Sequence, residues 1–198
     1  EIVEVEPKIP EINPPPFNSL KEGTTPTQQT AFLEMLEEAA TGADPSLFWE
    51  RLVSTIIKQT KADIALLFGY NAETREWFPL SSYGLLNNFG GKELPSRGWK
   101  SLPTIVANEG DFMFAEDISK DRRFVGQMIR GTTALTFVGT TLQTETARIG
   151  SLCIGFNAQA ALTEEGRTSF LSLSHLIGPF LIQRGITLPV PTSEPVAL

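Results

Sequence analysis

The charged segment Glu116–Phe124 carries the residue types best suited to binding a small anion. It places two carboxylates, Asp117 and Asp121, close to the adjacent arginines Arg122 and Arg123. An arginine guanidinium can hold a carboxylate or phosphate through two parallel hydrogen bonds, and backbone amides near Asp117 can assist. The alternative is that both aspartates cap turns while the arginines stay in solvent. The segment therefore predicts either an anion site or a capped surface loop.

Two apolar strands that follow this segment alternate in side-chain size. In one of them the large and small residues fall on opposite faces, Leu152, Ile154 and Phe156 against Ser151, Cys153 and Gly155. The large face is expected to pack on helices. The small face leaves volume beside the sheet, which is either filled by the middle helix and loops or left as a pocket. In the partner strand Phe137 and Gly139 also alternate with their neighbours, but their faces are not assigned.

Together these segments define the candidate ligand-binding residues. They are Trp99, Phe114, Asp117, Arg122, Arg123, Phe124, Phe137, Ser151 and Cys153. Trp99 precedes the predicted middle helix and either covers the pocket or packs in the core. Cys153, in the middle of a strand, is expected to be a small buried apolar residue.

The sequence offers no arrangement of acid, base and nucleophile that is typical of an active site. The chain has one histidine, His175, and one cysteine, Cys153, so neither a structural zinc site nor an internal disulfide can form. His175 has no positioned partner for a Ser/His/Asp arrangement, and nothing near Cys153 would activate a thiol. The sequence therefore predicts that the protein is not an enzyme, and it identifies no cofactor.

Hydrophobic periodicity and turn signals predict the elements that position these residues. Helices are expected over Thr27–Ala40, from an Asp44 cap with Pro45 at the first position, from Lys100 or Ser101 to Asn108, and from a Thr163 cap to Arg184. Strands are expected over Ala62–Tyr70, Glu76–Tyr83, Phe112–Phe114, Ala134–Leu142 and Arg148–Phe156. This order predicts an α+β fold with a central antiparallel sheet. The terminal helices should cover one face together, and a short helix and loops the other.

The two ends of the chain differ from this interior. Nine of the 14 prolines lie in Glu1–Pro26 and Gly185–Leu198. Proline interrupts helices and sheet ladders, so we expect residues 1–26 to form a linker or arm. The domain is expected to span 27–185 and a flexible tail 186–198.

Composition narrows the partners and the compartment. The net charge is −7, which argues against a nucleic-acid surface and an anionic membrane, because both require clustered lysine and arginine. No apolar run approaches the roughly 18 residues that a membrane span needs. The single cysteine fits either a reducing compartment or an exported protein without disulfide bridges, and of these we expect the cytoplasm.

The predicted order, with three landmarks, resembles the GAF domain family over about Asp44 to Arg184. The PAS family is the alternative with a similar sheet, but its members usually lack the long helices at both ends. The landmarks are the strand ADIALLFGY, the passage LPTIVANEGDFMFAEDISKDRRF, and the strand pair TALTFVGTTL and RIGSLCIGF before a long helix. The resemblance implies a sensory or regulatory module in which a small molecule lies between the sheet and nearby loops. It also implies dimerisation through the terminal helices in many members. The resemblance equally implies a ligand-free dimerisation or relay unit, because many members have no known ligand.

The resemblance does not identify the ligand. Members that attach a bilin use a cysteine near the pocket, and Ala115–Gly131 contains none. Members that reduce methionine sulfoxide need more than one cysteine. The residue set of cyclic-nucleotide-binding members is not found here in order.

Two functional hypotheses follow. The first is a signal-sensing domain of a larger signalling protein that binds a small molecule between the sheet and residues 114–131. The second is a ligand-free scaffold that forms a homodimer or binds a partner protein. The first and last helices carry apolar residues that form either a dimer interface or intramolecular packing between the two helices. They are Phe32, Leu36, Phe170, Leu173, Ile177 and Leu181.

Overall fold

The computed structural model describes residues 26–41, 47–84, 97–124, 135–157 and 163–189. The elements within these ranges are α1 (Pro26–Ala40), α2 (Phe48–Thr60), β1 (Ile64–Asn71), β2 (Glu76–Tyr83), α3 (Arg97–Asn108), β3 (Phe112–Ala115), the 3₁₀ turn η3 (Arg122–Phe124), β4 (Thr136–Gln143), β5 (Arg148–Phe156) and α4 (Glu164–Arg184). Their order confirms the predicted α+β class. Residues 1–25 and 190–198 lie outside the described residues, so the linker and the tail stay predictions.

The starts of two helices differ from the sequence prediction. α2 begins at Phe48, and its N-cap residue Leu47 makes no side-chain capping bond. The predicted cap at Asp44 and Pro45 lies outside the described residues. α3 begins at Arg97 rather than at Lys100 or Ser101. Gly98, which favoured a loop there, falls in the first turn, where backbone N–H groups need no partner within the helix.

The five strands form one antiparallel sheet in the order β2-β1-β5-β4-β3. β5 is the central strand and pairs with β1 on one side and with β4 on the other. The short strand β3 pairs with β4 at one edge, so that Phe114 lies opposite Val138 and Met113 opposite Gly139. Because paired residues in an antiparallel ladder share a face, this register decides which way each side chain of β3 points.

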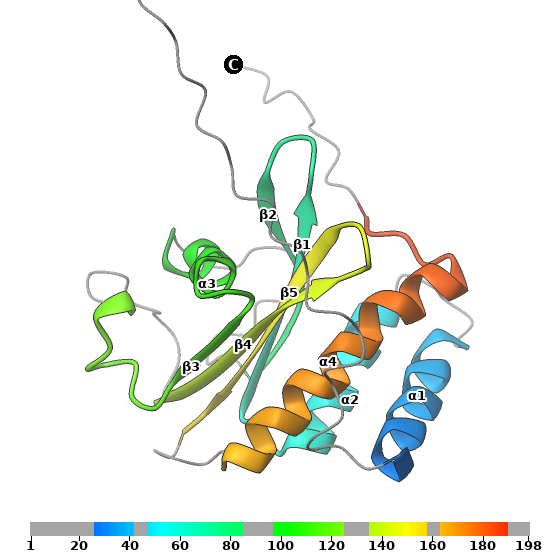
Figure 1. Cartoon of the computed structure of the whole chain (residues 1–198), viewed down its shortest axis with the longest axis horizontal. Coiled ribbons are helices and arrows are strands. Elements are labelled where there is room, and N and C mark those ends of the chain that lie inside the picture. The colour runs from blue at the N-terminus through cyan, green and yellow to red at the C-terminus, as the bar shows by residue number, and fades with distance from the viewer. Residues whose placement is uncertain (1–25, 42–46, 85–96, 125–134, 158–162, 190–198) are drawn as a thin grey trace, which may run out of the picture.

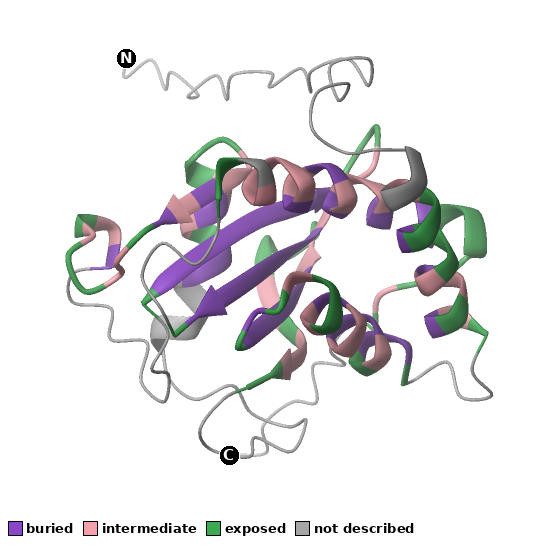
Figure 2. Cartoon of the chain, turned by 90° about the horizontal axis from the view of Figure 1, so that it is seen from below, coloured by how far each residue is buried: buried purple, intermediate pink, exposed green. Residues whose placement is uncertain are grey.

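Helices lie on both faces of the sheet (Figure 1), and each face has its own hydrophobic core. On one face, residues of α1, α2 and α4 pack against the large residues of β4 and β5, including Val138, Leu152 and Ile154. On the other face, Leu102 and Val106 of α3 pack against small residues of the same strands. This arrangement confirms the predicted assignment of the two faces. Figure 2 shows most of the sheet as buried.

α1 is the outermost helix and packs on α2 and α4 (Figure 1). Five of the apolar residues considered for a dimer interface are buried in the core on this face, so they pack within the chain: Phe32, Leu36, Phe170, Ile177 and Leu181. Its C-terminal half is tied to the end of α4 by an ion pair, in which Arg184 Nε donates to Glu37 Oε1 at 3.0 Å. α4 itself has both predicted ends. Thr163 Oγ1 accepts from the Gly166 N–H at 3.1 Å, and Gly185 ends the helix with φ +62°. Among the described residues, no helix is long and apolar enough to cross a lipid bilayer.

A close contact between α4 and the end of β4 yields the first prediction. A Cβ atom added at Gly178 would lie 2.0 Å from the Gln143 carbonyl oxygen, and neither backbone can easily move. We expect Gly178→Ala to lower the free energy of unfolding by about 2–3 kcal/mol, despite a gain of about 1 kcal/mol in helix propensity. Urea unfolding measures this change as a shift of the midpoint, with the dependence of the free energy of unfolding on urea concentration unchanged.

Gly185→Ala on the same helix is the control. The space beside Gly185 is open, so only its left-handed backbone opposes a side chain, and we expect a loss of about 1 kcal/mol. If Gly178→Ala costs less than Gly185→Ala, the described contact between α4 and β4 is wrong.

Candidate functional site

The nine predicted ligand-binding residues do not gather in one place. Phe137 and Cys153 face α3, together with Phe124 from η3. Phe114 lies on the opposite face of the sheet, where the Arg167 guanidinium of α4 sits 4.1 Å from the centre of its ring. A ligand lying between α3 and the sheet would therefore not reach Phe114. The side chain of Trp99 lies outside the described residues.

Asp117 forms a capped turn at the start of the charged segment. Its Oδ1 accepts from the backbone N–H of Ser119 at 3.0 Å and from the Ser119 hydroxyl at 2.6 Å. Lys120 Nζ lies 2.7 Å from Oδ2. The hydrogen bonds from Lys120 and Ser119 lower the pKa of Asp117 to about 2. The capped-turn alternative is therefore confirmed for this residue.

Arg123 is held by the protein rather than exposed to solvent. Its Nε donates to Asp121 Oδ1 at 2.9 Å, one terminal nitrogen donates to Glu109 Oε2 at 3.0 Å, and the other donates to the Phe114 carbonyl at 2.6 Å. All three guanidinium nitrogens thus have partners, and together they fasten η3 to β3 and to the end of α3. The expectation that both arginines stay in solvent fails for Arg123, whereas Arg122 is exposed.

The ion pair between Arg123 and Asp121 has a clear electrostatic signature. The hydrogen bond from Arg123 lowers the pKa of Asp121, and the carboxylate of Asp121 raises the pKa of Arg123 in return. The Asp121 carboxylate also accepts from the backbone N–H of Arg123 at 2.9 Å. A single aspartate therefore both caps the turn and orients the arginine.

The small face of β4 and β5 is filled within the described residues. A Cβ atom added at Gly139 would lie 2.5 Å from Val106 Cγ2 and 3.0 Å from Cys153 Sγ, so α3 sits directly on these strands. Phe124 is 6% exposed and packs into the same core. The sequence left two alternatives for the space beside this face, a pocket or a filled core. In the part that the structure describes, the space is a filled core. Residues 85–96 and 125–134 lie outside the described residues.

Cys153 and Ser151 are buried residues of the packed core. Cys153 is fully buried, and burial raises the pKa of its thiol to about 12. Ser151 donates its hydroxyl proton to the Thr140 carbonyl at 3.0 Å, and its oxygen lies 3.9 Å from Cys153 Sγ. The expectation of a small buried apolar cysteine is confirmed.

Sequence reasoning missed a polar cluster at the start of β3. Asp111 has φ +73° and pairs with Arg148 at 2.8 Å, while its carbonyl accepts from the Thr140 hydroxyl and the Thr141 N–H at 3.0 Å each. Burial lowers the pKa of His175 on α4, and the charge of Asp111 partly opposes this. These partners are up to 64 residues apart in the chain (111 to 175), so no local motif marks them.

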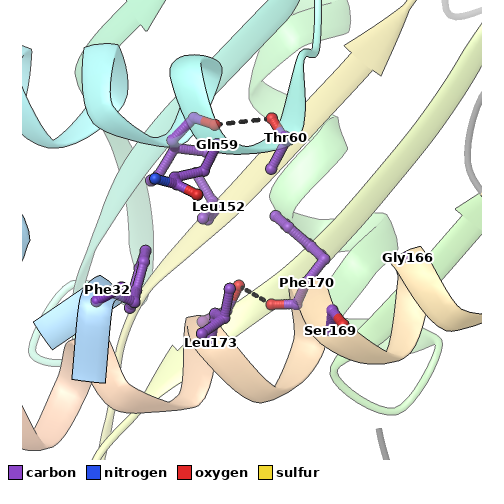
Figure 3. Close-up of a pocket in the computed structure, with 11 residues that line it drawn as sticks. Phe32, Gln59, Thr60, Leu152, Gly166, Ser169, Phe170 and Leu173 are labelled. Atoms are coloured by element: carbon purple, nitrogen blue, oxygen red, sulfur yellow. Dashed lines mark hydrogen bonds between the residues drawn. The ribbon is translucent and has the colours of Figure 1, made fainter. Parts of the chain in front are cut away.

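A cavity that the sequence did not predict lies on the other face of the sheet, between α1, α2 and α4 (Figure 3). Its volume is about 270 Å³, and its walls include Phe32 of α1, Ile56 of α2, Leu152 of β5 and Phe170 of α4. None of the nine predicted residues lines it. The available signal was the group of small residues on facing helices, Ala31, Gly166, Ser169 and Ser174.

The comparisons with known proteins identify the fold. The sequence matches no protein-family model and no curated protein. Among solved structures, the GAF domain of an Acinetobacter phosphoenolpyruvate-protein phosphotransferase superposes with a TM-score of 0.63 at 13% identity, over 82% of this chain and 97% of that one. The GAF domain of the cyanobacteriochrome TePixJ superposes with a TM-score of 0.57 at 12% identity, over 75% and 96%. The chain therefore has the GAF fold, as the sequence resemblance implied.

A further structure with this fold corrects one expectation. The free methionine-R-sulfoxide reductase from Neisseria meningitidis, in complex with its substrate, superposes with a TM-score of 0.59 at 11% identity, over 82% of this chain and 95% of that one. The prediction that the protein is not an enzyme was wrong as an exclusion, because this fold carries catalysis in such proteins. The lack of a familiar catalytic motif was too weak a criterion.

The tie between Asp121 and Arg123 gives a prediction about pH. Because the folded-state pKa of Asp121 is lowered, its stabilising contribution is present above the ordinary value of 3.8 and is lost as pH falls through the folded value. We expect Asp121→Asn to lower the free energy of unfolding by about 1–2 kcal/mol near neutral pH. The difference from the parent protein should shrink below about pH 4.

Glu73→Gln is the control, because Glu73 is exposed in the turn between β1 and β2. We expect it to change the free energy of unfolding by less than about 0.5 kcal/mol at any pH tested. Urea titrations at a series of pH values measure both variants. An Asp121→Asn effect that stays constant down to about pH 3 would contradict the role of this carboxylate.

Proposed function

We propose that this GAF-fold domain is a regulatory, signal-sensing domain of a larger signalling protein. The observation that carries the proposal is the outer helix layer, in which α1 and α4 lie side by side (Figure 1). These are the first and last helices of the described domain. A change in their packing therefore moves both ends of the domain, where it would join the rest of a longer chain.

The packing of this layer supports a regulatory role. α1 contacts the domain chiefly through α2 and α4, so it can shift without breaking strand pairing. The Glu37–Arg184 ion pair is partly exposed, with side-chain exposures of 37% and 48%, and such pairs contribute little to stability. A ligand that favours one arrangement of these helices shifts the population toward it. The helix layer is thus a suitable element to switch between two arrangements of α1 and α4.

The finer form of the proposal places a small molecule between the sheet and residues 114–131. Arg122 supports it, because this cation is exposed on η3 and can reach an anionic group. Arg123 and Phe124 support the site indirectly, by fixing η3 against the domain.

A ligand-free scaffold is the second candidate function, and the filled face between α3 and the sheet favours it. Two large apolar side chains, Leu33 of α1 and Ile182 of α4, are 39% and 64% exposed on the outer helices. They are suitable contacts for a homodimer or a partner protein. Sedimentation at several concentrations tests the dimer, and a strict monomer would remove that form of the hypothesis.

Charge reversal across the helix layer tests the regulatory proposal. In the full-length protein, we expect Glu37→Arg and Arg184→Glu each to change signalling output about two- to fivefold, because repulsion shifts a nearly balanced equilibrium. The double variant should return output toward the parent value. Signalling output and thermal stability are measured together, so that unfolding is recognised.

Glu38→Arg is the matched control, because Glu38 is exposed one residue away on α1. It should leave output unchanged. Single reversals that behave like this control, in a folded protein, would contradict signalling through the α1–α4 contact.

A further inference from the structure

The cavity between α1, α2 and α4 exists because small side chains lie where three helices meet the sheet. Gly166 and Ser169 are one turn apart on α4, and Ala31 of α1 lines the same space. Leu152 of β5 forms the floor (Figure 3). Aromatic rings at these positions would close the space, so the small residues determine its size.

The lining of this cavity is uncharged throughout its described residues. Thr60 donates its hydroxyl proton to the Ile56 carbonyl at 2.8 Å, and Ser174 donates to the Phe170 carbonyl at 2.6 Å (Figure 3). The hydroxyl protons of Thr60 and Ser174 are therefore used within their own helices. A charged group buried there would lack a partner for its charge, which is costly. The cavity thus selects against ions.

Two features favour an aromatic molecule with one hydrogen-bond donor. The rings of Phe32 and Phe170 approach from different helices and offer aromatic contacts. Gln59, at the rim, reaches from α2 to α1, where its Nε2 lies 2.9 Å from Met35 Sδ. Its amide oxygen is an acceptor at the same rim.

Volume sets the size of the occupant. An apolar cavity of about 150 Å³ is enough to bind benzene. This cavity, at about 270 Å³, has room for a molecule with two fused rings. We propose that it is a binding site for a compact, uncharged aromatic molecule of the size of indole.

This site differs from the one expected between the sheet and residues 114–131, because it lies on the opposite face. A molecule bound there contacts α1, α2 and α4 at once, so it can act directly on the helix layer. The consequence for signalling rests on the proposed regulatory function. Binding itself does not, and the experiment below measures only binding by this 198-residue chain.

Indole is the probe, followed by two-dimensional NMR of the backbone amides. We expect saturable shifts confined to residues around the cavity on α1, α2 and α4, with a Kd on the order of 0.1–1 mM. Indole-3-acetate, which adds a carboxylate to the same ring system, should bind at least about tenfold more weakly. Shifts centred on α3 and η3, or no saturable binding, would overturn the proposal and leave the regulatory function open.

Filling the cavity provides the matched test. Ser169→Leu projects a larger side chain from the α4 wall and should weaken indole binding by about tenfold or more. Ser54→Leu makes the same substitution on α2 outside the cavity lining and should leave the Kd unchanged. Ala31→Leu fills the space from α1 and keeps the test decisive if Ser169→Leu does not fold. Parent-like binding by a folded filling variant would overturn the proposal.

Discussion

The close approach of α3 to the small face of β4 and β5 is the contact on which the rest of the structure depends. Gly139 and Cys153 lie opposite each other in the ladder, and they leave just enough space for Val106. This side of the domain is therefore tightly packed. Phe124 packs into the same core, and Arg123 fastens the charged segment to the end of α3 through Glu109.

The opposite face of the same two strands has the reverse character. Large side chains such as Leu152 and Ile154 hold the helices away from the sheet, and small residues on α1 and α4 leave part of that interval open. A side-chain size pattern in two strands thus produces a tightly packed side and a side that contains a cavity. The side with the cavity contains the helix layer for which we propose a regulatory role, and the tightly packed side supports it.

Sequence reasoning recovered what depends on local pattern. The alternation in β5 assigned its faces correctly, and Thr163 and Gly185 marked the ends of α4. It could not place Phe114, because β3 has four apolar residues in succession and only its register with β4 decides their direction. The partners of Arg123 could not be predicted either, since Glu109 and the Phe114 carbonyl reach it through tertiary packing. The cavity depends on the spacing of three helices, and the sequence pattern of one helix does not predict that spacing.

A double-mutant cycle between Gly139 and Val106 tests the central contact most directly, with the free energy of unfolding as the readout. Gly139→Ala should destabilise the domain by about 1–3 kcal/mol, because its new methyl group meets Val106. In the Val106→Ala background the same substitution should cost at least about 1 kcal/mol less. Additive effects of the two substitutions would show that α3 does not rest on this face, and would contradict the account.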